Sequence, residues 1–178
     1  MKKIQTVFVV DRSKRPHQIT RTVQAQWVLD GEGIATVKFD GTACLVQDGV
    51  LYRRFDAKPN RRIPNGFLPC EHAPDPVTGH HSGWVPVTDE PTDKYHREAF
   101  NPELADGTYE LLGPKIQGNR YGSPRHELRR HGLDIVEVER SFDGIKAMLE
   151  NMDHEGLVFH HPDGRMAKIR KKDFGLNW

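Results

Sequence analysis

The hydrophobic pattern along the chain is mostly that of β-strands. Short runs rich in Val, Ile, Phe and Tyr, bounded by Gly, Asp and Pro, are typical of strands. The first third of the chain predicts strands at residues 4–10, 34–39, 42–46 and 50–55. An Asp48-Gly49 pair separates the last two, and Asp-Gly between apolar runs favours a tight β-hairpin. This part of the chain therefore predicts antiparallel strand pairs.

The second half of the chain predicts further strands and one helix. Residues 109–112 and 135–138 are expected to form core strands, and residues 156–159 and 166–170 two final strands joined by a Pro-Asp-Gly turn. Ser141 is expected to cap a helix, because its side chain can accept a hydrogen bond from the first helical turn. The apolar positions of this helix recur at helical spacing and are Phe142, Ile145, Met148, Leu149 and Met152.

Between residues 56 and 101 the pattern changes. Prolines and glycines are frequent there and apolar positions show no regular period, which predicts a long excursion rather than part of a sheet. No internal repeat, low-complexity tract or linker divides the chain. We therefore expect a single domain over residues 1–178. Its fold class is expected to be α+β, with mainly antiparallel sheets and a few helices.

Composition places few limits on this picture. Of 178 residues, 36% are hydrophobic and 29% charged, as in an ordinary soluble protein, and no apolar run is long enough to cross a bilayer. The start, Met1-Lys-Lys-Ile-Gln, lacks the apolar region of a signal peptide. We therefore expect a cytoplasmic protein without membrane contact. In that compartment Cys44 and Cys70 are expected to stay reduced.

A net charge of +1 does not by itself indicate a nucleic-acid partner, but local charge does. Basic side chains gather in two stretches of the sequence, and phosphates attract such clusters. A solvated protein surface is the alternative interpretation of either stretch. The first consists of Arg53, Arg54, Lys58, Arg61 and Arg62, and the second of Lys168, Arg170, Lys171 and Lys172.

A lysine inside an apolar strand is the most informative single feature. Lys38 stands between Val37 and Phe39, just before an Asp-Gly turn. Burial favours the neutral form of an amine, and a neutral amine near other cations is a nucleophile. The alternative is a lysine at a strand end whose head extends to water.

The other charged positions in strands do not follow the pattern of a solvent face. Glu110 and Glu155 stand within apolar segments, and Lys168 and Arg170 are two apart, so they leave the same face of one strand. We expect these side chains to line one cleft. A site for a nucleoside triphosphate needs both basic and acidic side chains. Cations bind the phosphates, one carboxylate accepts hydrogen bonds from the ribose hydroxyls, and a second carboxylate holds a metal ion.

The order Lys38-x-Asp-Gly, Arg54, Glu110, Glu155-Gly-Leu-Val and Lys168-x-Arg170 resembles the motifs of the covalent nucleotidyltransferases, which are DNA ligases, RNA ligases and messenger-RNA capping enzymes. Longer blocks are similar to the small ATP-dependent RNA ligase family that includes the vertebrate 5′-to-3′ RNA ligase. These blocks are residues 31–44, 54–60, 75–86, 95–100, 109–119, 155–158 and 168–175.

This resemblance implies a fold and a reaction. The fold is a nucleotidyltransferase (adenylation) domain of the ATP-grasp-like ligase type, with no OB domain. Lys38 would attack the α-phosphorus of ATP and expel pyrophosphate. The lysyl-AMP would pass AMP to an RNA 5′-phosphate, and an RNA 3′-hydroxyl would then attack the activated end and release AMP. Covalent catalysis of this kind divides one difficult condensation into easier displacements.

The resemblance also implies a role for each charged residue. Asp40 and Glu110 would serve the ribose and the surroundings of the lysine, and Glu155 would hold Mg²⁺, with Mn²⁺ as the alternative. Lys168 and Arg170 would bind the α-phosphate of the nucleotide.

Other nucleotide and RNA contacts follow from the same resemblance. His131 would stack on adenine, with Val158 on the opposite face, unless His131 is an ordinary solvated or backbone-bonded histidine. Val37 occupies a nucleotide-binding position where an acidic residue is expected, so a side-chain contact to adenine is not implied there. Arg54 would contact the RNA phosphate, unless it only pairs with Asp56.

Two further alternatives concern a metal and the overall function. Cys70, His72, His80 and His81 suggest zinc, but no paired Cys-x-x-Cys accompanies them. An ATP-dependent DNA ligase and a catalytically silent nucleic-acid-binding relative remain as alternatives to RNA ligase. The complete set of catalytic charges argues against a silent protein.

Overall fold

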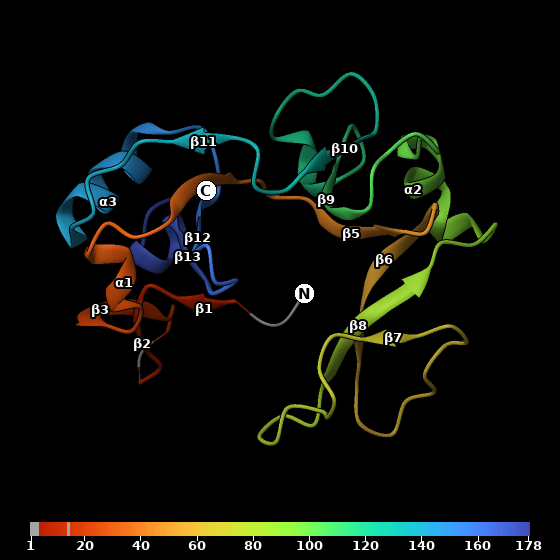
Figure 1. Ribbon diagram of the computed structural model, residues 1–178, viewed down its shortest axis with the longest axis horizontal. Helices are drawn as coiled ribbons and strands as arrows, with labels where there is room; N and C mark the ends of the chain where they lie inside the picture. The colour runs from red at the N-terminus through yellow and green to blue at the C-terminus, as the bar shows by residue number, and fades with distance from the viewer. Residues whose placement is uncertain (1–3, 14) are drawn as a thin grey trace. The chain divides into compact units, whose positions relative to one another are not determined.

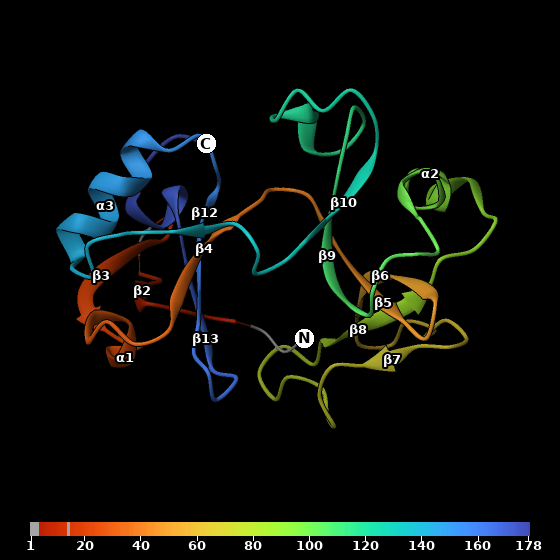
Figure 2. The same ribbon diagram turned by 45° about the horizontal axis from the view of Figure 1, so that its top comes forward.

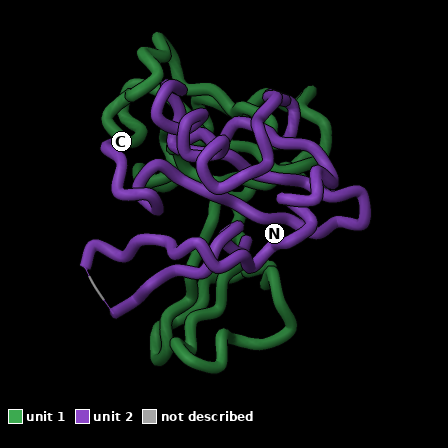
Figure 3. The backbone as a smooth tube through the Cα atoms, turned by 90° about the vertical axis from the view of Figure 1, so that its left-hand side faces the viewer, with its two compact units in different colours: residues 1–3, 40–131 green, residues 4–39, 132–178 purple. Residues whose placement is uncertain are grey.

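The computed structural model describes residues 4–13 and 15–178 (Figure 1). The chain divides into two compact units, shown in different colours in Figure 3. One comprises residues 4–39 and 132–178 and is called here the Lys38 unit; the other comprises residues 40–131 and is called the Glu110 unit. Each has its own sheet and its own buried core. That residues 1–178 form a single RNA ligase adenylation domain stays a prediction.

The Lys38 unit is built on a five-stranded sheet. In spatial order the strands are β1 (Gln5–Thr6), β13 (Met166–Arg170), β12 (Gly156–His160), β4 (Ile34–Lys38) and β11 (Ile135–Val136). All neighbours are antiparallel except β1 and β13. Two further strands, β2 (Phe8–Asp11) and β3 (Gln18–Val23), form a separate antiparallel pair. The helical segments are α1 (Gln26–Leu29), α3 (Phe142–Asn151) and η3 (Lys171–Phe174).

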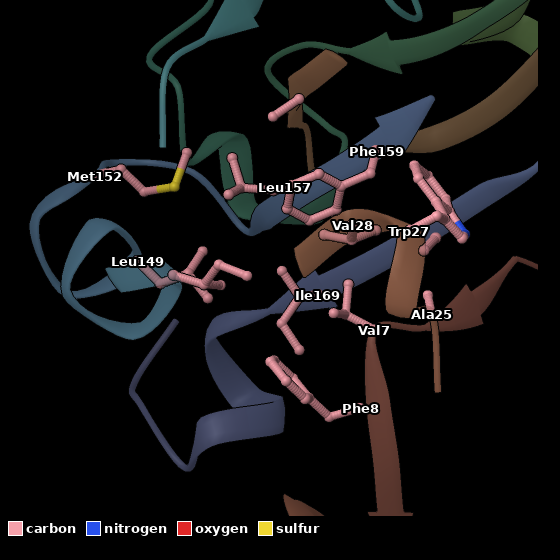
Figure 4. Packing of buried hydrophobic residues seen from close by; sticks show 13 residues of the cluster. Val7, Phe8, Ala25, Trp27, Val28, Leu149, Met152, Leu157, Phe159 and Ile169 are labelled. Atoms are coloured by element: carbon pink, nitrogen blue, oxygen red, sulfur yellow. The ribbon is translucent and has the colours of Figure 1, made fainter. Parts of the chain in front are cut away.

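Alternation along the strands gives this sheet one apolar face. Leu157 and Ile169 are fully buried in a cluster with Ile145 and Leu149 of α3. Figure 2 shows α3 beside β12 and β4, and Figure 4 shows Leu149, Leu157 and Ile169 gathered with Phe8 in the core. The core therefore fixes one face of the sheet and leaves the alternate positions of the same strands for polar residues.

The Glu110 unit is built on a six-stranded antiparallel sheet. Its strands, in spatial order, are β10 (Glu127–Arg130), β9 (Gly107–Leu112), β5 (Thr42–Gln47), β6 (Val50–Ala57), β8 (His81–Pro86) and β7 (Leu68–Pro69). The helical segments are η1 (Pro91–Asp93), α2 (Lys94–Ala99) and η2 (Gln117–Asn119). Tyr95 and Ala99 of α2 pack against the buried residues of one sheet face, which are Cys44, Val46, Leu51, Tyr109 and Leu111.

Several expectations about local structure are confirmed. Asp48 and Gly49 have positive φ angles of 51° and 72° and join β5 to β6 as a tight hairpin. Ser141 caps α3, because its side chain accepts a hydrogen bond of 2.9 Å from the Gly144 N–H. Strands β4, β9, β12 and β13 lie where the pattern predicted them. The α+β class with mainly antiparallel sheets is confirmed.

Other expectations about local structure are wrong. The strand predicted at residues 4–10 is broken at Val7 into β1 and β2, which join different sheets. The strand predicted at residues 135–138 is only the two-residue β11, at the sheet edge, and Ile135 is exposed rather than in the core. The excursion over residues 56–101 contains β8, which pairs with β6 at six positions.

The strands β3 and β10 were not anticipated from the sequence either. Their residues are largely polar, so that neither has an apolar run long enough to indicate a strand. Among the described residues, no helix has the length and apolar character needed to span a membrane.

Candidate functional site

Lys38, Lys168 and Arg170 lie on one face of the five-stranded sheet, opposite its core. In the register, Gly156 of β12 pairs with Lys38 on one side and with Arg170 on the other. Val158, two residues further along β12, pairs with Lys168. Because strand side chains alternate between faces, these positions form one surface, called here the polar face.

Gly156 is required where the strands of the polar face approach one another. A Cβ atom at this position would lie 2.1 Å from the Ile169 carbonyl oxygen and 2.8 Å from the Arg170 Cα. Both are backbone atoms of β13, which cannot turn aside as a side chain can. The glycine in Glu-Gly-Leu-Val thus has a steric cause, and it brings the rows of Lys38 and Arg170 close together.

Lys38 is paired with Glu155 on the polar face. Its ammonium forms a hydrogen-bonded ion pair with the Glu155 carboxylate and also donates to the Phe39 carbonyl at 3.3 Å. The side chain of Glu155 is only 10% exposed, and that of Lys38 24%. Lys38 is therefore a largely enclosed amine held by one carboxylate, a partner that the sequence did not indicate for it.

Arg170 has a carboxylate partner in an ion pair, whereas Lys168 has none among the described residues. Arg170 donates from Nε and Nη2 to the two carboxylate oxygens of Asp173, at 3.0 and 2.7 Å. Lys168 forms no ion pair with any residue that the structure describes. Burial, and then the charges of Arg170 and Lys38, lower the pKa of Lys168 to about 8. Lys168 is thus a partly buried cation without a fixed anion.

The two valines assigned to nucleotide binding lie on opposite faces. Val158 shares the polar face with Lys168, its register partner. Val37 packs against the apolar core of the Lys38 unit, on the other face of β4 from Lys38. The Val37 side chain is therefore turned away from the polar face.

In the Glu110 unit, Glu110 joins two segments of chain. One of its carboxylate oxygens accepts from the Gly41 N–H at 3.0 Å, and the other meets His131 Nε2 at 2.8 Å. His131 Nδ1 also lies 3.0 Å from the Thr108 hydroxyl. His131 is therefore hydrogen-bonded through both ring nitrogens, which fixes the plane of its ring.

Asp40 is held by two residues that the sequence argument did not select. Its N–H donates to the Tyr121 hydroxyl oxygen at 2.8 Å, and its carboxylate lies 3.6 Å from Arg120 Nε. Gly41 follows, and a Cβ there would lie 2.3 Å from the Leu111 carbonyl oxygen. The glycine of Lys-x-Asp-Gly, like Gly156, is thus required by a close backbone approach.

Neighbouring arginines on β6 point to opposite faces of the sheet. Arg53 lies on the core face and pairs through Nε with Asp93 at 2.7 Å. Burial opposes ionisation of Asp93, but hydrogen bonds from Thr88 and the charge of Arg53 lower its pKa. Arg54 lies over the Trp84 ring, 5.1 Å from its centroid, and Nη1 is 3.1 Å from Cys70 Sγ. The two arginines therefore differ in their surroundings, and the assignment of the RNA contact to Arg54 stays a prediction.

Three of the four residues of the zinc alternative have separate partners. Cys70 contacts Arg54, His80 meets the Asp56 carboxylate at 2.7 Å, and His81 meets the Glu71 carbonyl oxygen at 2.7 Å. Within residues 4–13 and 15–178, no group of three His, Cys, Asp or Glu residues is arranged to hold a metal ion. Both cysteines are free thiols.

The structure brings together two subsets of the predicted site residues. The Lys38 unit assembles Lys38, Glu155, Lys168 and Arg170, and the Glu110 unit assembles Asp40, Glu110 and His131. That all of them line one cleft stays a prediction.

Sequence reasoning did not assign roles to Asp173, Arg120 or Tyr121. Asp173 had a signal, since it lies three residues after Arg170 within a block that resembles the ligases. Arg120 and Tyr121 directly follow another such block, residues 109–119, but nothing in their own pattern indicates Asp40 as a partner.

Comparisons with known proteins agree with the motifs. No protein-family model matches the chain. Mouse RNA ligase 1 is 25% identical over an alignment that covers 99% of this chain and 81% of the mouse protein. Rat RNA ligase 1 is also 25% identical, with 99% and 82% covered, and the zebrafish protein is 28% identical over 62% of this chain and 44% of its own length. The chain is therefore similar to RNA ligase 1 over nearly its whole length, which confirms its closeness to the RNA ligase family.

Proposed function

We propose that the protein is an ATP-dependent RNA ligase that joins a 5′-phosphate to a 3′-hydroxyl through a lysyl-AMP intermediate on Lys38. One observation carries this proposal. Lys38 meets the carboxylate of Glu155 on a sheet face that also presents Lys168 and Arg170. A nucleophile, a carboxylate and two cations on one surface fit attack of an amine on a phosphate better than simple phosphate binding. The similarity to RNA ligase 1 supports RNA as the substrate.

The cations of the polar face suit a nucleotide phosphate. Lys168 is buried enough for its pKa to be lowered, and it forms no ion pair with any described side chain, although the charges of Asp173 and Glu155 act on it. Arg170 uses two of its five N–H groups on Asp173, which leaves others to donate while the guanidinium is held in place. An α-phosphate bound here would satisfy Lys168 and lie on the face where Lys38 is presented.

Glu155 fits a divalent cation only as part of a shared site. Mg²⁺ is commonly held by one or two carboxylates together with substrate phosphates and water, and Mn²⁺ accepts the same oxygen ligands. One carboxylate cannot fully serve both a metal ion and Lys38. In our proposal Glu155 would hold the metal ion in the nucleotide complex, and the Lys38 ammonium, no longer paired with it, would lose its proton to water before the neutral amine attacks. The metal would supply charge neutralisation at the reacting phosphates.

The Glu110 unit is suited to the nucleoside and the RNA end. A carboxylate has about four lone-pair sites, so Glu110 can still accept hydrogen bonds from ribose hydroxyls in addition to those with Gly41 and His131. Both ring nitrogens of His131 form hydrogen bonds in the plane of the ring, so the faces of the ring are held in a fixed orientation. Stacking on adenine would use one of these faces. Arg54, positioned on Trp84, would contact the RNA 5′-phosphate.

Adenylation of Lys38 is the direct test. After incubation with ATP and magnesium, intact mass spectrometry should show an AMP adduct in the wild-type chain and none in Lys38→Ala. Lys38→Arg should not recover it, because a guanidinium stays protonated. An adduct that persists in Lys38→Ala would refute the assignment.

Matched RNA and DNA ends then distinguish the ligase types. We expect sealing of 5′-phosphorylated RNA and little sealing of nicked all-DNA duplexes, since the 2′-hydroxyl is what separates the two sugars. Joining should also weaken as salt rises, because phosphate contacts release counterions. Faster joining of the DNA nick would favour the DNA ligase alternative, while an intact Lys38 that forms no adduct would favour a silent nucleic-acid-binding protein.

A further inference from the structure

The loop between β9 and β10 has an unusual backbone. Gln117 and Asn119 both have positive φ angles, 44° and 51°, although neither is glycine. Such conformations persist only where the surrounding structure holds them, and they are frequent at functional sites. Asn119 supplies part of that support, because its side chain accepts from the Ser123 N–H at 2.9 Å and donates to the Ser123 carbonyl at 3.3 Å. The loop therefore presents the two residues that follow Asn119 in a fixed arrangement.

Those two residues, Arg120 and Tyr121, both contact Asp40. The Tyr121 hydroxyl accepts from the Asp40 N–H at 2.8 Å, and Arg120 Nε lies 3.6 Å from an Asp40 carboxylate oxygen. The next N–H along the chain, that of Gly41, donates to Glu110 at 3.0 Å. Two successive N–H groups of the Asp-Gly turn are thus each held by a side chain from more than 60 residues away.

The Asp-Gly turn needs such support. Gly41 must lack a side chain because of the nearby Leu111 carbonyl, and glycine gives the backbone more freedom than any other residue. Asp40 has to present its carboxylate in a defined direction if it is to serve the nucleotide. A phenol ring has few rotatable bonds, so the Tyr121 hydroxyl is a rigid acceptor, and the Arg120 charge holds the carboxylate itself.

We infer that Arg120 and Tyr121 are positioning residues for binding of the nucleotide. They act through Asp40 and are not catalytic residues. Tyr121 fixes the backbone of the turn, and Arg120 sets the direction of the Asp40 carboxylate. This inference rests on the proposed function, because it takes Asp40 as a nucleotide-binding residue.

The test measures the initial rate of lysyl-AMP formation against ATP concentration, together with the thermal midpoint of each variant. Tyr121→Phe removes the hydroxyl that accepts from the Asp40 N–H and should raise the half-saturating ATP concentration about three- to tenfold, the scale of one lost hydrogen bond. The maximal rate and the thermal midpoint should change little. Tyr109→Phe is the matched control, because the Tyr109 hydroxyl donates to the Ala105 carbonyl at 2.6 Å in the core of the same unit. It should lower the thermal midpoint and leave half-saturation unchanged.

Arg120 provides a second, independent measurement. Its separation from Asp40 is that of a charge interaction rather than a close hydrogen bond. Arg120→Ala should therefore raise half-saturation by ATP, and Arg120→Lys, which keeps the charge, should recover most of the loss. Arg125→Ala, at an exposed arginine of the same loop, should match the wild type.

The outcomes separate this inference from the proposed function. Wild-type adenylation with unchanged half-saturation in both Tyr121→Phe and Arg120→Ala would overturn the inference alone. So would a Tyr121→Phe protein that, like Tyr109→Phe, loses thermal stability without a change in ATP dependence. A wild-type chain that forms no lysyl-AMP would remove the proposed function and the inference with it.

Discussion

Lys168 should give the first step of the reaction a distinctive pH dependence. Burial and the charges of Arg170 and Lys38 lower the pKa of Lys168 from 10.5 to about 8. In the free protein its charge is therefore lost within the range in which enzymes are assayed. If Lys168 binds the α-phosphate, the protein that is competent to bind ATP is the protonated form.

The magnitude follows from that pKa. About 90% of Lys168 is charged at pH 7, half at pH 8 and about 10% at pH 9. At low ATP concentration, the rate of lysyl-AMP formation should therefore fall toward a limit of about tenfold per pH unit above pH 8. The direction of this change in rate is informative, because the neutral form of a nucleophilic amine becomes more abundant as pH rises. A falling rate above pH 8 thus cannot come from deprotonation of the nucleophile.

The assay compares wild type with Lys168→Arg at low ATP between pH 7 and 10. An arginine stays charged over this range, so the falling limb should disappear in Lys168→Arg, even if its rate at pH 7 is lower. Saturating ATP should shift the wild-type limb to higher pH, because phosphate binds the charged amine preferentially. Equal pH profiles in the two proteins, or a wild-type rate that does not fall up to pH 10, would refute the role given to Lys168.

Folding stability provides a check that does not depend on activity. The pKa of Lys168 is lower in the folded chain than in the unfolded one, so the unfolded chain binds more protons between pH 8 and 10.5. Across that window, the free energy of unfolding of wild type should rise relative to that of Lys168→Met. Urea denaturation at several pH values measures this difference, and a constant difference would contradict the lowered pKa.

Two further predictions concern the polar face and the RNA contact. Gly156→Ala should lower the free energy of unfolding by about 3 kcal/mol or more, because its Cβ would lie 2.1 Å from a backbone oxygen. The control is Gly31→Ala, in open space at φ +83°, which should lower the free energy of unfolding by only about 1–2 kcal/mol. Equal losses of the two variants in urea denaturation would refute the steric argument. Arg54→Ala should form lysyl-AMP but fail to transfer AMP to RNA, whereas Arg53→Ala should lose about 3 kcal/mol of stability because it leaves the buried Asp93 charge unpaired. Gel analysis of labelled RNA tests the first of these two variants, and loss of lysyl-AMP in folded Arg54→Ala would contradict the role of Arg54.

The sequence by itself determined the features that depend on neighbouring residues. The strand around Lys38, the hairpin at Asp48-Gly49 and the helix capped by Ser141 all follow from local periodicity, turn chemistry and capping, which act within a few residues. The spacing of Lys168 and Arg170 likewise places both on one strand face without any tertiary information.

Only the tertiary structure decided which distant residues meet. The sequence of strand β8 has no alternation of apolar and polar residues that would predict a strand. The segment is a strand because it pairs with β6 and because Trp84 is buried. The contact of Lys38 with Glu155 joins positions 117 residues apart, and that of Asp40 with Tyr121 joins positions 81 apart. Such contacts depend on the register and packing of whole strands and loops. The sequence could therefore name the chemical groups of the candidate site, but only the fold shows which groups hold one another in place.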